Sequence, residues 1–223
     1  MRKRSFSLKY MVLTYRLDML WLPAAFWALF LIITAMIREE PMGPPLCVAY
    51  LGTALPLVSG ILAAYAVLDD PALELQFATP RPAWILLAER LGFIFLLAAL
   101  CAVLYQVALI PLQMDLTPLG SLPARQLAWI VPTLAMIGLG AAATLANRQS
   151  MAGAAAVGIV WIFQIVMRDW FLDDGIARHF LLLMGSNYPD NPALRVNQAV
   201  LSFAALLLIF AAWALLRRQE RYI

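Results

Sequence analysis

The sequence predicts an all-α polytopic membrane protein with a single transmembrane domain over residues 1–223. Of these residues, 64% are hydrophobic and 13% are charged, whereas about a quarter of the residues in a soluble domain are charged. Six stretches of 17 to 23 residues contain no Asp, Glu, Lys or Arg, and about 20 apolar residues cross the hydrocarbon core of a bilayer. This composition excludes a soluble enzyme, a secreted disulfide scaffold and a disordered chain. The six predicted transmembrane helices are residues 19–37, 46–68, 91–112, 127–146, 151–167 and 199–216.

The Lys and Arg residues around these helices predict that both termini are cytoplasmic. If the N-terminus lies inside, the cytoplasmic segments hold eleven Lys and Arg residues and the outside segments hold five. Cytoplasmic loops of membrane proteins carry an excess of positive charge, so this orientation is favoured. The basic residues are spread over all of the connecting segments, which offers no basic patch for a nucleic acid.

Residues 1–18 are expected to form an N-terminal interfacial helix at the cytoplasmic surface. Phe6, Tyr10, Leu13 and Leu17 recur at helical spacing beside a stripe of basic residues. Long basic side chains can reach the lipid head groups while the apolar face lies in the bilayer. The alternative is a helical extension of the first transmembrane helix.

The segments between the predicted transmembrane helices differ in length. Residues 38–45 form a proline-rich turn on the outside, and residues 113–126 form an outside loop with two prolines. Residues 147–150 are so short that the fourth and fifth helices must form an antiparallel hairpin. The long extracytoplasmic segment 168–198 could fold as two short re-entrant or interfacial helices broken near residues 185–189.

The predicted transmembrane helices contain no ionisable residue of the kind that marks proton relays and ion sites. Gln106 and Gln164 are among their few polar residues, and interhelical hydrogen bonds or packing account for them. Ion-coupled secondary transport is therefore disfavoured, and the energy for any transport would come from another source. Cys47 and Cys101 are interpreted as buried apolar residues.

Aromatic residues inside the predicted helices have two possible roles. They could line a transport pathway, but packing or contact with lipid is favoured. The residues concerned are Trp27, Tyr50, Tyr105 and Trp161.

No catalytic or metal site is predicted. The chain has one histidine, His179, and two distant cysteines, which do not match a zinc site. It also has no phosphate-binding loop of its own, because its two lysines fit no G-x-x-x-x-G-K-[ST] pattern. We expect the chain not to be an enzyme by itself.

Residues 69–90 form the longest predicted cytoplasmic connection. Asp70 can cap a short helix that begins at Pro71, and Thr79 before Pro80 ends that helix, because a residue before proline avoids helical geometry. A second helix starting near Ala83 runs into the third transmembrane helix. From the residues alone, the short helix either docks on a soluble partner or is an interfacial helix with no partner.

The run Leu73-Glu74-Leu75 through Ala78-Thr79-Pro80, with acidic residues before it and Arg90 after it, resembles the coupling segment of ABC-2 type transporter permeases. Glu74 matches the core glutamate of that pattern, and Thr79-Pro80 matches its Ser/Thr-Pro pair. Pro71-Ala72 replaces a common glycine, and Gln76 interrupts the leucine run. The resemblance implies that this helix docks on a separate ATP-binding subunit. The implied contact residues are Asp70, Leu73, Glu74, Phe77, Thr79 and Arg81.

The same resemblance implies the assembly and the location of the protein. A second copy of this chain or a related permease would pair with it in the lipid bilayer of a bacterial plasma (inner) membrane. Two P-loop ATPase subunits would bind ATP and Mg²⁺, and no cofactor is expected in this chain. The expected mechanism is alternating access driven by ATP.

Alternatives from other classes remain open at this point. Residues 174–178 (Asp-Gly-Ile-Ala-Arg), with Gly185 and Asp190, resemble part of the CDP-alcohol phosphotransferase motif, which would make the chain a lipid-modifying or intramembrane enzyme. One residue is missing from that motif, and Phe171 and Leu194 stand where it has aspartates. A non-transporting membrane scaffold is a third possibility. A haem-exporter permease of the cytochrome c maturation type is similar in length and number of spans.

Overall fold

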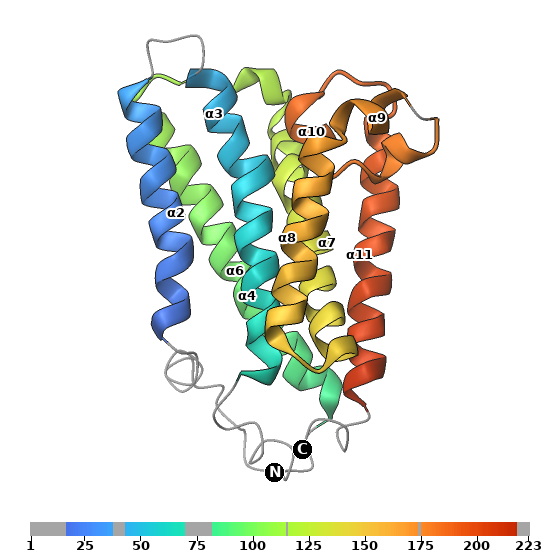
Figure 1. The fold of residues 1–223 in the computed structure, drawn as a ribbon. Helices are drawn as coiled ribbons and strands as arrows, with labels where there is room; N and C mark the ends of the chain where they lie inside the picture. The colour runs from blue at the N-terminus through green and yellow to red at the C-terminus, as the bar shows by residue number, and fades with distance from the viewer. Residues whose placement is uncertain (1–16, 38–42, 70–81, 115, 174, 218–223) are drawn as a thin grey trace, which may run out of the picture.

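The computed structural model describes residues 17–37, 43–69, 82–114, 116–173 and 175–217, and these residues form a bundle of long helices (Figure 1). No β-strand occurs among them. The helices of the bundle are α2 (Leu17–Met36), α6 (Ala83–Leu109), α7 (Leu122–Asn147), α8 (Ser150–Val166), α11 (Leu194–Leu216) and one continuous helix of three parts. These parts are α3 (Gly43–Ala49), the π-helical turn η1 (Tyr50–Ala54) and α4 (Leu55–Leu68). The short elements are η2 (Thr117–Leu119), α9 (Arg168–Asp173), η3 (Ala177–Phe180) and α10 (Met184–Asn187).

Four helices among the described residues are long and apolar enough to cross a membrane. They are Pro45–Leu68, Trp84–Leu109, Leu122–Asn147 and Leu194–Leu216. Two shorter apolar helices, Trp21–Met36 and Ser150–Val166, lie beside them. The prediction of an all-helical chain is therefore confirmed for the described residues, and four of the six predicted spans correspond to helices long and apolar enough to cross a membrane.

Several helices begin earlier than the charge-free stretches do, as α6 and α7 show. Helix α6 begins at Ala83, the start expected for the helix that leads into the third span, and it therefore contains Glu89 and Arg90. Helix α7 begins at Leu122 and contains Arg125 in its first turns. Charged residues thus lie in the first turns of these helices, where the sequence prediction placed connecting segments.

The bundle has two ends, which we call the base end and the cap end. The base end holds the end of α4, the start of α6 and the turn between α7 and α8 (Figure 1). The cap end holds the short helices α9, η3 and α10. The cap contains three short helices rather than the expected two, and residues 185–187 lie in α10 rather than in the break. Residues 1–16, most of the expected interfacial helix, lie outside the described residues.

Small residues bring the central helices into close contact. A Cβ atom added to Gly140 of α7 would meet the backbone of Gly60 in α4, and one added to Gly153 of α8 would meet Thr144 of α7. Gly138 of α7 similarly faces α11. Close backbone approach through glycine is typical of helices that pack in membranes. The sequence therefore builds a tightly packed centre from α4 and α7, against which α8 and α11 pack closely.

Candidate functional site

The predicted coupling segment connects the end of α4 to the start of α6 at the base end. Its six expected contact residues, Asp70, Leu73, Glu74, Phe77, Thr79 and Arg81, lie outside the described residues. The structure describes the two points from which the segment leaves the bundle, Asp69 after α4 and Pro82 before α6. The candidate site is therefore built here from the contacts that fix those two points.

The first attachment point is fixed by a hydrogen bond across the bundle. The hydroxyl of Ser150, the first residue of α8, donates to Asp69 Oδ1 at 2.6 Å. Ser150 is buried, and the backbone N–H of Asp69 also donates to the carbonyl of Tyr65 at 3.3 Å. A charge-assisted bond of this kind is shorter and stronger than one between neutral groups. The end of α4 is therefore held to the start of α8.

The second attachment point is fixed by Arg90. Its side chain is only 7% exposed, and its guanidinium donates to the carbonyl of Ala66 in the last turn of α4. The last carbonyls of a helix lack partners within the helix, and a cation is favoured there by the helix dipole. This bond joins the first turns of α6 to the end of α4.

The turn between α7 and α8 completes the base end. Arg148 adopts a left-handed conformation with φ of 56°, which reverses the chain between the two helices. Thr144 Oγ1 donates to the carbonyl of Ala64 in α4 at 2.9 Å, and the N–H of Gln149 donates to the carbonyl of Thr144 at 3.2 Å. Together with the bond from Ser150 to Asp69, the Thr144 bond means that the hairpin contacts α4 and its end at two levels. Force applied to the coupling segment would reach α4, α6, α7 and α8 together.

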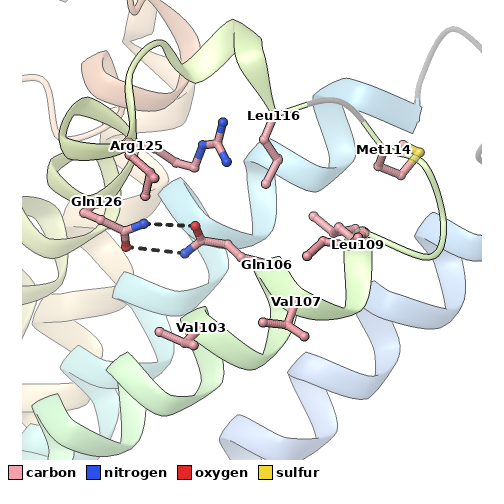
Figure 2. Close-up of a pocket in the computed structure, with 10 residues that line it drawn as sticks. Val103, Gln106, Val107, Leu109, Met114, Leu116, Arg125 and Gln126 are labelled. Atoms are coloured by element: carbon pink, nitrogen blue, oxygen red, sulfur yellow. Dashed lines mark hydrogen bonds between the residues drawn. The ribbon is translucent and has the colours of Figure 1, made fainter.

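A pocket of about 550 Å³ lies at the other end of the bundle, between the end of α6 and the start of α7 (Figure 2). Gln106 of α6 and Gln126 of α7 form an amide pair, with N···O distances of 3.0 and 3.4 Å. Trp129 Nε1 donates to the same Gln126 oxygen at 2.7 Å. Arg125 lies beside this pair, and its Nε atom is buried with no hydrogen-bond partner among the described residues. The pocket is lined by Val103, Gln106, Val107, Leu109, Ile110, Met114, Leu116, Leu122, Arg125 and Gln126.

The sequence prediction for the polar residues inside the helices is confirmed. Gln106 forms the interhelical pair described above. Gln164 of α8 donates to the carbonyl of Phe180 at 3.1 Å and accepts from the N–H of Leu182 at 3.0 Å, which ties α8 to the cap. Both amides are therefore structural contacts.

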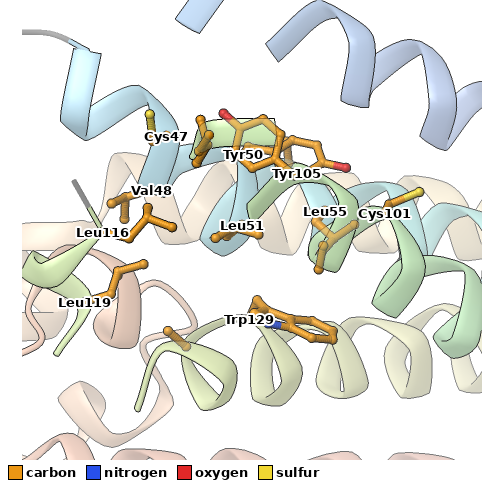
Figure 3. Close-up of a cluster of buried hydrophobic side chains, with 14 of the residues drawn as sticks. Cys47, Val48, Tyr50, Leu51, Leu55, Cys101, Tyr105, Leu116, Leu119 and Trp129 are labelled. Atoms are coloured by element: carbon orange, nitrogen blue, oxygen red, sulfur yellow. The ribbon is translucent and has the colours of Figure 1, made fainter. Parts of the chain in front are cut away.

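The aromatic residues considered for a transport pathway pack inside the bundle instead. Tyr50 and Tyr105 are buried side by side (Figure 3), and their ring centroids are 4.2 Å apart. The Tyr105 hydroxyl shares a hydrogen bond of 3.1 Å with Thr34. Trp161 Nε1 donates to the carbonyl of Thr53 at 3.0 Å. Trp27 packs against the same core as the two tyrosines.

The two cysteines are also buried. Cys47 and Cys101 lie in the cluster around Tyr50 and Tyr105 and form no disulfide (Figure 3). Their interpretation as small apolar core residues is confirmed.

The cap end contains the residues of the alternative enzyme prediction. Asp174 lies outside the described residues, and Arg178 and Asp190 are exposed. Arg168 and Asp169 form an exposed ion pair at 3.2 Å. Among the residues that the structure describes, no three His, Cys, Asp or Glu side chains gather to hold a metal ion.

Sequence analysis missed Arg125 and the residues that fix the base end. Arg125 was assigned to an outside loop, although its neighbour Gln126 and the span residue Gln106 were a signal of polar contact at that depth. Ser150 was assigned to a turn, and nothing in its sequence surroundings indicated its bond to Asp69.

Comparison of the chain with models of protein families, with curated proteins and with solved structures finds no match.

Proposed function

We propose that this chain is the permease subunit of an ATP-driven ABC transporter of the ABC-2 type. In this proposal all six apolar helices span the membrane, both termini are cytoplasmic and the base end faces the cytoplasm. The residues between Asp69 and Pro82 dock on a separate ATP-binding subunit. Two permeases and two ATPase subunits form the complete transporter.

The observation that carries the proposal is the way in which both ends of the coupling segment are fixed to the bundle. Ser150 holds Asp69, and Arg90 holds the carbonyl of Ala66. A segment that transmits movement must be joined rigidly to the parts that it moves. The motif from Leu73 to Pro80 supplies the docking surface, and these two bonds supply the connection to four helices.

The distribution of charge supports an external energy source. In the long described helices, charged residues lie only within the first eight residues, as with Arg90 in α6, Arg125 in α7 and Arg195 in α11. A carrier driven by an ion gradient would use ionisable residues deeper in the membrane. ATP hydrolysis in a partner subunit removes that need. The expected cycle is alternating access, in which ATP closes the ATPase dimer and residues 71–79 move with it.

Copurification tests the proposal directly. We expect the chain, extracted from its native membrane in mild detergent, to carry a stoichiometric soluble protein with a P-loop. Glu74→Arg should reduce the amount of this partner by about tenfold or more, because a misplaced charge at an interface costs several kcal/mol. It should also abolish the stimulation of ATPase activity by the permease. The measurement is quantitative mass spectrometry of the purified complex.

Glu39→Arg is the matched control. It makes the same charge reversal in the turn of residues 38–45, which the proposal places on the opposite side of the membrane. It should leave the ATPase bound at the wild-type level. Wild-type chain that carries no P-loop protein in an intact membrane complex, or a Glu74→Arg chain that retains it fully, would show that the proposal is wrong.

A further inference from the structure

The pocket at the cap end has an apolar wall on two sides. Leu109 and Leu116 are buried and form its inner wall. The outer residues are 50 to 71% exposed, and they form an apolar surface that continues along α6. These outer residues are Val103, Val107, Ile110 and Leu122.

Among the described residues that line the pocket, Arg125 brings the only charge. Its Nε atom is shielded from solvent and has no hydrogen-bond partner in the described part of the chain. Gln106 and Gln126 bond to each other, and the Gln126 oxygen also accepts from Trp129 (Figure 2). The two amides are therefore paired with each other, and the guanidinium is the charged group available to bind a ligand. Its planar set of N–H donors matches the oxygens of a phosphate or a carboxylate.

The position of Arg125 in α7 sets the depth of the pocket. Arg125 is the fourth residue of a helix that is long enough to cross the membrane, so it lies near the level of the lipid head groups. Helix α6 ends beside the pocket, so the exposed residues Val103 and Val107, which precede that end, lie deeper, toward the hydrocarbon. The pocket therefore places a cation beside an apolar groove, as the binding of an amphiphile requires.

We propose that this pocket binds an anionic membrane lipid, with its head group on Arg125 and an acyl chain along Val103, Val107 and Ile110. A free anion would satisfy the guanidinium but would leave the apolar groove unused. A zwitterionic lipid would fill the groove, but the cation of its head group would compete with the guanidinium for the phosphate. The inference does not depend on the proposed transport function, because it uses only contacts within this chain.

Native mass spectrometry of the purified, delipidated chain tests the proposal, with phosphatidylglycerol as the probe. We expect Arg125→Gln to weaken binding about tenfold, the size expected for a hydrogen bond to a charged group. Phosphatidylcholine should bind the wild-type chain more weakly than phosphatidylglycerol. Arg168→Gln is the control, because Arg168 is an exposed arginine at the same end of the bundle and lies outside the pocket. It should bind phosphatidylglycerol like the wild type.

A second pair of variants tests the groove without changing any charge. Val107→Trp fills the space along α6 and should also weaken phosphatidylglycerol binding several-fold. Val196→Trp makes the same change at an exposed position of α11 and should have no effect. Both positions are about half exposed, so neither substitution disturbs the core.

Two results would overturn the proposal. If Arg125→Gln binds phosphatidylglycerol as tightly as Arg168→Gln does, Arg125 does not hold the head group. If sn-glycerol 3-phosphate binds as tightly as the intact lipid and Val107→Trp binds like Val196→Trp, the pocket binds free anions instead.

Discussion

Helices α4 and α7 are more buried than helices α6 and α11, although their most apolar windows have the lower mean hydropathy. A soluble protein would show the opposite relation. The most apolar windows of α6 and α11 have the higher mean hydropathy of the four long helices, yet only 33% and 22% of their residues are buried, against 72% for Pro45–Leu68, which contains α4, and 67% for α7. In a soluble domain the most apolar helix lies in the core. Here the two long helices with the more apolar windows lie on the outside, which is where a bilayer would replace water as the solvent.

The chemistry of the two pairs explains this reversal. Lipid tails are as apolar as leucine, so helices in a membrane associate through close packing and interhelical hydrogen bonds. The central pair supplies both, through Gly60, Gly140 and the bond from Thr144 to the carbonyl of Ala64. The outer pair presents large apolar side chains such as Leu96, Phe203 and Leu206. Glycine and threonine thus mark the centre, and large apolar residues mark the surface.

The largest effect is expected from a charge placed on the outer surface of the bundle. Leu206 lies near the middle of α11 and is 66% exposed. Leu206→Asp should raise the free energy of membrane insertion by about 3 to 4 kcal/mol, because aspartate is strongly disfavoured and leucine mildly favoured at the centre of a transmembrane helix. The measurement is the fraction of chain that resists carbonate extraction from membranes.

Two controls separate membrane insertion from packing. Leu206→Ala should insert normally, because it places no charge in the bilayer. Ile176→Asp changes another exposed apolar residue, in the cap, and should also insert normally. Full insertion of Leu206→Asp would mean that this face of α11 contacts water and would contradict the comparison of the helix pairs.

A smaller effect is expected at the glycine contact of the central pair. A Cβ atom on Gly140 would lie 3.1 Å from the carbonyl carbon of Gly60 and 3.2 Å from the nitrogen of Ala64, and backbone atoms cannot rotate away. Gly140→Ala should therefore destabilise the bundle by about 2 kcal/mol, within the usual range for overpacking. Unfolding by sodium dodecyl sulfate in mixed micelles measures this loss.

Gly92 of α6 is the matched glycine in an outer helix. A Cβ atom there would meet no atom of another element within 4 Å among the described residues. Gly92→Ala should be neutral or should stabilise the protein by up to about 1 kcal/mol, because alanine favours the helix more than glycine does. Equal effects at Gly92 and Gly140 would show that helix propensity, rather than packing, dominates at both sites.

The helices could be predicted from the sequence because their apolar runs are long and bounded by charges. The same rule placed the charged residues Arg90 and Arg125 outside the spans, although both lie within long helices. Arg90 was used to end a connecting segment, but its charge is buried and bonded to the carbonyl of Ala66 inside the bundle. Arg125 was treated in the same way and lies in the pocket. A charge marks the edge of a span only where water or head groups are its partners, and a carbonyl or a bound ligand can take their place.

The ranking of the helices by burial could not be predicted from hydropathy. Both the lipid and the protein core accept apolar residues, so the runs that contain Leu62 and Leu206 look alike in sequence. Glycine and threonine at Gly60, Gly140 and Thr144 were the available signal, but their partners lie about 80 residues away in the chain. At the base end, the motif indicated the coupling segment, while the bond between Ser150 and Asp69 depends on the fold.

The smallest expected effect tests whether hydrogen bonds add to the packing of the central pair. Thr144→Val keeps the shape of the side chain and removes the donor to the carbonyl of Ala64 in α4. Bonds between transmembrane helices contribute about 0.6 kcal/mol on average, so unfolding in mixed micelles should show a loss of about that size. Ser59→Ala is the control, because its hydroxyl bonds to the carbonyl of Leu55 in its own helix at 2.7 Å and joins no two helices. If Thr144→Val costs no more than Ser59→Ala does, glycine packing rather than this bond holds α4 to α7.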